Sequence, residues 1–202
     1  MVEKINENRA MDNGSSLAKQ VADIILRQAN QKERFLVAID GRCASGKTTL
    51  AMKLKEMLDC EVVHMDHFFL RPEQRREERL NIPGENVDHE RFLQEVLLPL
   101  YEGKEAVYRP FNCKCLEFDA PIRIRKCKIY IIEGSYSCHR ALGEYYNLRI
   151  FMDVSPEEQM RRIVRRNGAD AAEVFRSKWI PLEEGYFEKY NIADASDYCF
   201  TT

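Results

Sequence analysis

The feature that most constrains this chain is the glycine-rich stretch GRCASGKTTL at residues 41–50, directly behind the apolar run FLVAID at residues 35–40. A glycine, four residues and then Gly-Lys-Thr is the spacing of a loop whose backbone N–H groups cradle phosphates between a strand and a helix. Gly41 lets the chain turn out of the strand, and Gly46 lets the backbone approach an anion. The helix that begins at Lys47 turns its positive end toward the same place. The sequence therefore predicts a phosphate-binding loop in a strand–loop–helix unit.

Seven residues of this stretch are expected to contact a nucleotide, namely Gly41, Ala44, Ser45, Gly46, Lys47, Thr48 and Thr49. Within this set, the Lys47 ammonium would reach the β and γ phosphates, and the Thr48 hydroxyl would bind Mg²⁺. A chance match in an ordinary turn is the alternative, but the apolar strand before the loop and the helical pattern after it weigh against it. The expected cofactors are Mg²⁺ and a phosphate donor, either ATP or GTP.

The rest of the chain alternates short apolar runs with helical patterns. Strands are predicted at residues 35–40, 61–65, 128–133, 148–154 and 197–200. Helices are predicted at residues 16–30, 47–58, 88–101, 137–146, 155–167 and 170–190. Most of these strands are continuously apolar, as expected for strands buried on both faces of a parallel sheet. The pattern predicts a three-layer α/β fold, the P-loop NTPase fold, with a mostly parallel five-stranded sheet.

The length of 202 residues and the 45% hydrophobic composition suit one sizeable core, so residues 1–202 are predicted to form a single domain. Residues 1–34 are interpreted as an N-terminal helical extension. Residues 107–126 break the alternation and predict a small antiparallel hairpin that turns around Asp119-Ala120-Pro121 on the substrate side. Residues 155–170 are predicted to form a lid.

The charge balance argues for a small-molecule substrate. Lysine and arginine total 31 and aspartate and glutamate total 33, for a formal net charge of -2. Such a balance lacks the broad basic surface that nucleic acid or an anionic membrane would need. No long apolar run follows the polar start, and the seven cysteines are scattered without a C-x-x-C pair. A cytoplasmic protein with reduced thiols is therefore expected.

Two acidic residues follow predicted strands, where parallel α/β sheets place their ligand crevice. Asp66 lies just past the strand at residues 61–65, and it is expected to accept a hydroxyl proton or to help orient Mg²⁺. Glu133 ends the strand before Gly134 and is expected to support the magnesium shell. The alternative for each acid is a solvated loop carboxylate. A zinc site built from Asp66 with His64 and His67 is a weaker alternative.

Four arginines in the segment SPEEQMRRIVRRNG, residues 155–168, lie at helical spacings. Arg161 and Arg165 share one helix face, and Arg162 and Arg166 share the next, so one pair is able to turn toward a transferring phosphoryl group. A wholly solvated charge run is the alternative. The position of the segment after the strand at 148–154 favours a mobile lid.

The chain resembles the uridine kinase branch of the uridine kinase and phosphoribulokinase superfamily from about Phe35 to Phe200. The resemblance rests on IDGRCASGKTT, MDHFFLRPEQR, NVDHERF, IIEG and the arginine-rich helix. It implies that Asp66 activates the acceptor hydroxyl and that Asp88 binds ribose hydroxyls. The lid arginines that it implies for phosphate binding are Arg165, Arg166 and Arg161. Members of this family are often oligomeric, so the resemblance is compatible with a homo-oligomer.

The resemblance predicts a kinase of a pyrimidine nucleoside, but the chain departs from the family where the base is read. Family members tend to carry a tyrosine, an aromatic residue and a histidine there, whereas this chain has Tyr108, Phe111 and then Asn112-Cys113. Tyr108 and Phe111 are expected either to stack on the base or to pack within the insertion. A non-nucleoside alcohol, such as pantothenate or a sugar phosphate, is an alternative acceptor. A nucleotide hydrolase or switch and a noncatalytic nucleotide-binding module are the alternative functions.

Overall fold

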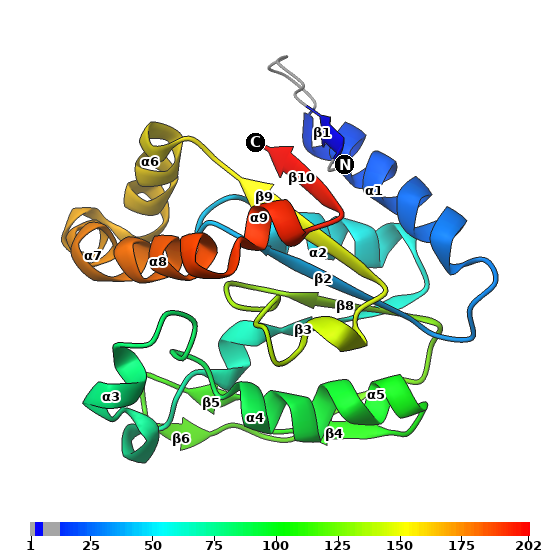
Figure 1. Ribbon diagram of the computed structural model, residues 1–202, viewed down its shortest axis with the longest axis horizontal. Helices are drawn as coiled ribbons and strands as arrows, with labels where there is room; N and C mark the ends of the chain where they lie inside the picture. The colour runs from blue at the N-terminus through cyan, green and yellow to red at the C-terminus, as the bar shows by residue number, and fades with distance from the viewer. Residues whose placement is uncertain (1–2, 6–12) are drawn as a thin grey trace.

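The computed structural model describes residues 3–5 and 13–202, and its centre is a parallel sheet of six strands (Figure 1). The strands are β1 (Glu3–Ile5), β2 (Phe35–Gly41), β3 (Cys60–His64), β8 (Ile129–Glu133), β9 (Leu148–Asp153) and β10 (Tyr198–Thr201). Their spatial order is β1-β10-β9-β2-β8-β3, and every neighbouring pair is parallel. The five predicted strands are confirmed. The edge strand β1 was not predicted, since a three-residue strand carries too little periodicity to stand out.

Burial on both faces explains why the central strand β2 is apolar throughout. Phe35, Val37 and Ile39 point to a core that includes buried residues of α1 (Asn13–Ala29) and α2 (Lys47–Met57). The intervening Leu36 and Ala38 point to the opposite core. These two cores on either face of the sheet make the three layers of the predicted fold.

The second core lies between the sheet and a helical stretch that covers residues 89–102. This stretch consists of α4 (His89–Phe92), a π-helical segment (Leu93–Leu97) and α5 (Leu98–Glu102). Phe92, Val96, Leu97 and Leu100 are its buried contributions to that core. The helix predicted at 88–101 is therefore confirmed, with a π-helical segment in its middle.

The predicted helix at residues 137–146 is wrong. The segment forms turns and one short 3₁₀ helix, Gly143–Tyr145. Backbone hydrogen bonds join residues three apart, as from Leu142 N to His139 O at 2.8 Å. Tyr136 has a φ of 71°, and a buried carboxylate accepts the N–H groups of Tyr136 and Cys138. The carboxylate that accepts these N–H groups belongs to Asp40, at the end of β2.

The antiparallel insertion is present, but its turn lies elsewhere than predicted. Strand β4 (Ala106–Tyr108) pairs with β7 (Ile122–Ile124), and β5 (Phe111–Asn112) pairs with β6 (Glu117–Phe118). The chain therefore reverses at residues 113–116 instead of at 119–121. Asn112 stabilises this reversal, since its side-chain oxygen accepts from Lys114 N at 3.0 Å and its carbonyl accepts from Leu116 N at 2.8 Å.

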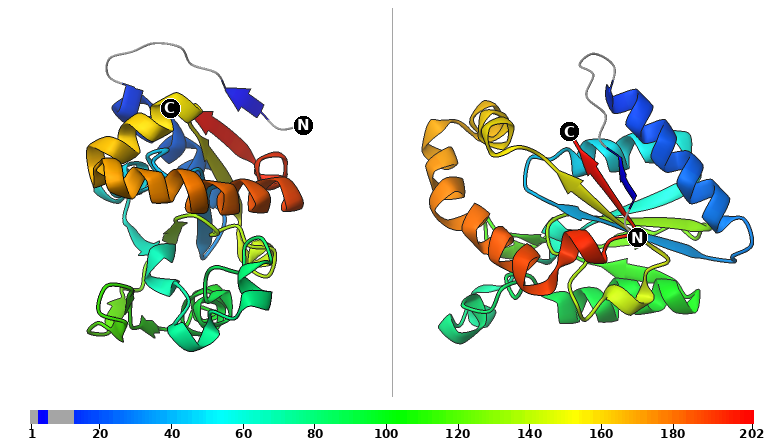
Figure 2. Two further views of the ribbon diagram at one scale, coloured as in Figure 1. Left: turned by 90° about the vertical axis from the view of Figure 1, so that its left-hand side faces the viewer. Right: turned by 45° about the horizontal axis from the view of Figure 1, so that its top comes forward.

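After β9, the chain forms helices that extend beyond one end of the sheet at α6 and α7 and return beside it at α9 (Figures 1 and 2). They are α6 (Pro156–Asn167), α7 (Ala169–Val174), a π-helical segment (Phe175–Trp179), α8 (Ile180–Tyr190) and α9 (Ile192–Ala195). Ser155 caps α6 by accepting from Glu158 N at 3.3 Å. Gly168, with a φ of 85°, ends α6 and lets the chain change direction into α7. This region contains residues 155–170, the segment that the sequence predicts to form a lid, and we call it the lid segment.

Two properties of the described residues bear on the sequence predictions. All seven cysteines lie within the described residues, and none of them forms a disulfide there. Among residues 3–5 and 13–202, none of the helices combines the length and apolar character needed to cross a bilayer.

Candidate active site

The loop between β2 and α2 takes a shape that only glycine allows at its start. Gly41 has a φ of 135°, and a Cβ atom there would lie 2.1 Å from the carbonyl oxygen of Met152 in β9. Gly46, with a φ of 92°, immediately precedes α2. The start of the loop therefore packs closely against β9, and its end leads directly into the N-terminus of α2.

Lys47 lies across this loop, as a phosphate-binding lysine should. Its side chain is 7% exposed, and its ammonium donates to the carbonyl oxygens of Gly41 at 2.6 Å and Arg42 at 2.8 Å. These contacts keep the ammonium within the curve of the loop. The charge is thus held where the outer phosphates of a nucleotide would bind.

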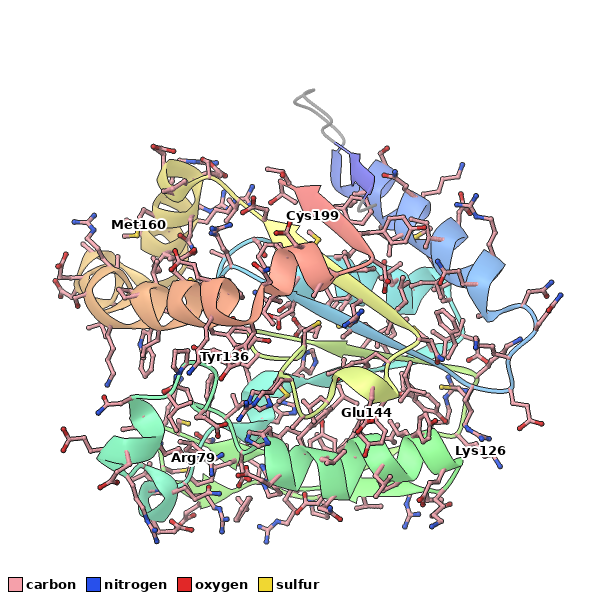
Figure 3. The ribbon with its side chains drawn as sticks, in the orientation of Figure 1. Arg79, Lys126, Tyr136, Glu144, Met160 and Cys199 are labelled. Carbon is pink, nitrogen blue, oxygen red and sulfur yellow. The ribbon has the colours of Figure 1, made fainter. Side chains whose placement is uncertain are left out.

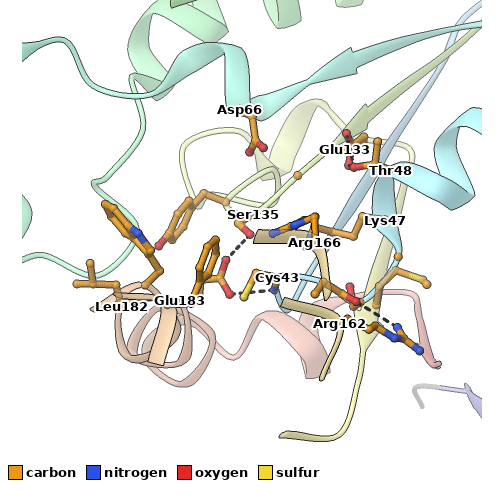
Figure 4. Close-up of a pocket in the computed structure, with 18 of the residues that line it drawn as sticks. Cys43, Lys47, Thr48, Asp66, Glu133, Ser135, Arg162, Arg166, Leu182 and Glu183 are labelled. Atoms are coloured by element: carbon orange, nitrogen blue, oxygen red, sulfur yellow. Dashed lines mark hydrogen bonds between the residues drawn. The ribbon is translucent and has the colours of Figure 1, made fainter. Parts of the chain in front are cut away.

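Glu133 and Thr48 meet at the carboxyl edge of the sheet (Figure 4). Glu133 is 4% exposed, and the Thr48 hydroxyl lies 3.1 Å from each of its carboxylate oxygens. His64 Nδ1 lies 2.5 Å from Glu133 Oε1. This hydrogen bond is the main cause of the raised pKa of His64. A hydroxyl and a carboxylate in contact form a set of hard oxygen ligands that suits Mg²⁺.

Asp66 extends into the cleft from the turn after β3, on the same side as Glu133 (Figure 4). Asp66 is exposed to the cleft, but the protein atoms packed around it remove part of the water from its carboxylate. Burial raises the pKa of Asp66, and the negative charge of Glu133 raises it further. Gly134 leaves room for the turn that carries Asp66, since a Cβ atom at Gly134 would lie 2.9 Å from the Cβ atom of Met65. Asp66 is therefore placed to receive a proton from a group bound in the cleft.

The geometry does not favour zinc at the two histidines that flank Asp66. His64 is bonded to Glu133, and His67 Nδ1 instead lies 2.9 Å from the hydroxyl of Tyr108. The two histidine rings meet edge to face with centroids 5.2 Å apart. Each imidazole therefore has a protein partner of its own.

The phosphate loop and both acids line one cavity of about 1930 Å³. The predicted nucleotide contacts that line it are Ala44, Ser45, Gly46, Lys47, Thr48 and Thr49. Gly41 lies behind the loop, against β9. One continuous space thus contains the phosphate loop, the proposed base and the proposed magnesium ligands.

The lid segment contributes three arginines to this cavity, namely Arg162, Arg165 and Arg166. Arg161, which was predicted to face the site, does not line it. Its guanidinium makes two hydrogen bonds of 2.6 Å to Glu158 on the same helix, and its side chain is 64% exposed. The spacing placed Arg165 on the face of Arg161, but Arg165 lines the cavity together with Arg162 and Arg166, whereas Arg161 does not.

Side chains of the lid segment also hold the carbonyl groups of the phosphate loop. Arg162 donates to Ala44 O at 3.1 Å and to the Thr202 hydroxyl at 2.8 Å. Gln159 donates to Cys43 O at 3.1 Å. The base of α6 is therefore fastened to the loop.

The three predicted acceptor contacts do not line the cavity. Asp88 is 2% exposed, and its carboxylate accepts from Gln74 Nε2 at 2.8 Å and from Arg91 N at 3.1 Å. Tyr108 and Phe111 are 3% and 5% exposed within the insertion. The described residues that line this end of the cavity instead are Phe69, Leu70, Arg75, Leu80, Asn81, Asn86, Cys113, Tyr136 and Trp179.

Asp40 is a site residue that the sequence analysis missed. It is fully buried at the end of β2, and it accepts N–H groups from Gly41 at 2.7 Å, Cys138 at 2.8 Å and Tyr136 at 3.1 Å. The hydroxyl of Tyr186 in α8 donates to it at 2.9 Å. Tyr136 lies beneath α8 (Figure 3) and meets Tyr186 edge to face. The sequence offered one sign of this role: Asp40 is a charged residue at the end of an apolar strand, directly before the phosphate loop.

Two adjacent acids of α8 were also missed. Glu183 is 5% exposed and accepts from Cys43 N at 3.0 Å and from the Ser135 hydroxyl at 2.5 Å (Figure 4). Glu184 accepts from the Arg42 guanidinium at 2.7 and 2.8 Å. The phosphate loop is thus tied to the helix that follows the lid. No local pattern signals these contacts, because about 140 residues separate the partners.

No protein-family model matches the chain. Among curated proteins, it is similar to uridine-cytidine kinase B of Dictyostelium discoideum, with 25% identity over 86% of this chain and 73% of the relative. It is also similar to a uridine kinase of Chlamydia pneumoniae, with 25% identity over 77% of this chain and 75% of the relative.

The chain is also similar to solved structures, among them two that are each matched over 94% of this chain. One is a possible uridine kinase from Bacillus stearothermophilus, with a TM-score of 0.66, 18% identity and 97% of that chain covered. At this identity, the similarity shows the fold alone. The other is a candidate fructose transport system kinase from a Silicibacter species, with a TM-score of 0.65, 26% identity and 100% of that chain covered.

Proposed function

We propose that this chain, a small-molecule kinase of the uridine kinase-like branch of the P-loop kinases, phosphorylates the 5′-hydroxyl of a pyrimidine nucleoside. The observation that carries the proposal is the single cavity that contains the phosphate loop, Asp66 and Glu133. The names of the curated relatives support a nucleoside as acceptor. The donor is ATP or GTP, with its phosphates on the loop.

Mg²⁺ would be held by Thr48 and Glu133, with Asp66 oriented toward the same place. This assignment follows from the contact between the Thr48 hydroxyl and both oxygens of Glu133, a donor set that suits a hard cation. When bound, Mg²⁺ offsets the negative charge of the outer phosphates. The hydrogen bond from His64 fixes the orientation of the Glu133 carboxylate.

The protein contributes mainly positioning and charge to phosphoryl transfer. The Lys47 ammonium lies in the curve of the loop and would contact the transferred group. Arg162, Arg165 and Arg166 would add positive charge from the lid side. Asp66 would accept the proton of the acceptor hydroxyl, and its raised pKa makes the carboxylate a better proton acceptor.

A non-nucleoside alcohol, such as a sugar or a sugar phosphate, is the second candidate acceptor. It is favoured by the burial of Asp88, Tyr108 and Phe111 away from the cavity. The polar side chains of Arg75, Asn81 and Asn86 line the acceptor end instead. The likeness to the candidate fructose transport system kinase supports the same alternative.

The test is to incubate the protein with Mg²⁺ and ATP or GTP, and to offer nucleosides, sugars, sugar phosphates and pantothenate separately. A phosphorylated pyrimidine nucleoside as the best product supports the first proposal, and a phosphorylated sugar supports the second. Nucleotide turnover that no acceptor accelerates would indicate a hydrolase or a switch. Nucleotide binding without any turnover would indicate a binding module.

Asp66→Asn tests the mechanism in the same assay. The change keeps the volume and removes the proton acceptor, so kcat should fall by about 10²- to 10⁴-fold while ATP still binds. Asp59→Asn, at a surface position with an 82% exposed side chain, is the matched control. Acceptor phosphorylation by Asp66→Asn at a rate near that of the unchanged protein would rule out this role.

A further inference from the structure

The lining of the cavity continues past the phosphate loop to the end of β10, which lies on the opposite side of β2 from β3 and Asp66. This second arm is lined by residues of α1, α2, α6 and the end of β10, which no step of phosphoryl transfer uses. They are Leu17, Gln20, Lys53, Glu158, Phe200, Thr201 and Thr202.

The direction of a bound nucleotide follows from the position of the acids. The γ-phosphate must face Asp66 and Glu133, because the acceptor and the magnesium ligands lie there. The nucleoside part of the donor must then leave the loop at its other end. The second arm is the part of the same cavity that lies at that end.

Two contacts hold α1 beside this arm. Val21, Ile24 and Ile25 are buried in the core that α1 shares with α2. Phe200 of β10, which lines the arm, belongs to the same core. The helix is therefore fixed on one side by the core and lies next to the β10 end.

Leu17 and Gln20 lie three residues apart on α1, so their side chains project from the same face of the helix. Both are half-buried and line the arm, one offering apolar surface and the other a carboxamide. Within the part of the chain that the structure describes, the Gln20 carboxamide has no hydrogen-bond partner. An amide that is open to a cavity beside an apolar side chain suits the edge and face of a nucleobase.

We propose that α1 forms one wall of the base site of the phosphate donor, with Leu17 packed on an adenine ring and Gln20 hydrogen-bonded to its edge. This proposal rests on the proposed kinase function. A carboxamide offers one donor and one acceptor side by side, which is the pattern that pairs with adenine. The N-terminal extension thereby serves to select the donor nucleotide.

The variants Gln20→Ala and Leu17→Ala test the proposal. The affinity of each variant is measured, in the presence of Mg²⁺, for two ligands: ATP and inorganic tripolyphosphate. Tripolyphosphate has the phosphates of ATP but no base, so a base contact affects only ATP. We expect each variant to weaken ATP binding by about 3- to 10-fold, the loss of one hydrogen bond or one apolar contact, with tripolyphosphate binding unchanged. Lys19→Ala, at an exposed position of the same helix, is the control and should bind both ligands normally.

Unchanged ATP affinity in both variants would overturn the proposal, and so would equal weakening of ATP and tripolyphosphate. Retained tripolyphosphate binding shows that the variants still fold around the phosphate loop. Failure of the unchanged protein to bind either ligand would instead refute the proposed kinase function. The two failures are therefore distinguishable in one set of titrations.

Discussion

The buried carboxylate of Asp40 makes the stability of the protein depend on pH in an unusual direction. Burial raises the pKa of Asp40 from 3.8 to about 6, although four hydrogen bonds partly oppose the effect. The folded protein therefore binds more protons than the unfolded chain between pH 4 and 6. The free energy of unfolding should fall as the pH rises through this window, in contrast to an aspartate in an ion pair.

The expected size follows from the shift. One pKa unit corresponds to about 1.4 kcal/mol, so a shift of roughly two units corresponds to about 3 kcal/mol. This contribution is fully present below pH 4 and is lost above pH 6. Asp40→Asn removes the titration but replaces one acceptor oxygen with an NH₂ group that faces two hydrogen-bond donors. Such a variant should be less stable than the unchanged protein by about 2–4 kcal/mol at pH 4.

The assay is urea unfolding followed by far-UV circular dichroism, at intervals from pH 4 to pH 7.5, for the unchanged protein and for Asp40→Asn. The difference in unfolding free energy between the two proteins should shrink by about 3 kcal/mol across this range. Asp23→Asn, at an exposed position of α1, controls for the loss of an acidic side chain. A difference that stays constant or grows as the pH rises would refute the reasoning.

Three further predictions concern the site. Glu133→Gln removes the charge of one of the two proposed Mg²⁺ ligands, Thr48 and Glu133, so the reaction should need a higher Mg²⁺ concentration and recover in part when Mg²⁺ is raised. An unchanged Mg²⁺ dependence would contradict this role. Arg162→Ala should lower kcat and loosen the phosphate loop, whereas Arg161→Ala should stay within about twofold of the unchanged protein in steady-state kinetics. Equal effects of the two arginine changes would show that the face of α6 does not matter. Gly41→Ala should abolish nucleotide binding and lower the melting temperature, because the new Cβ meets a backbone oxygen at 2.1 Å; a normal melting temperature would count against that contact.

The sequence alone determined the parts of this protein that depend on order along the chain. The spacing from Gly41 to Thr48 defined the phosphate loop, and the continuous apolar runs defined five strands of the sheet. Asp66 and Glu133 could be predicted to share one cavity because each follows a parallel strand, and parallel strands end at the same edge. Local order and backbone direction are sufficient for such conclusions.

Only the tertiary structure decided which side of each element meets the cavity. Helical spacing paired Arg162 with Arg166, but the docking of α6 determined that Arg161 faces solvent. The contact between Glu183 and Cys43 joins residues 140 positions apart. The segment 137–146 forms turns instead of the predicted helix, and the N–H groups of Tyr136 and Cys138 bond to Asp40 of β2, nearly 100 positions earlier in the chain. Such contacts depend on distances across the fold, which a local pattern of residues does not contain.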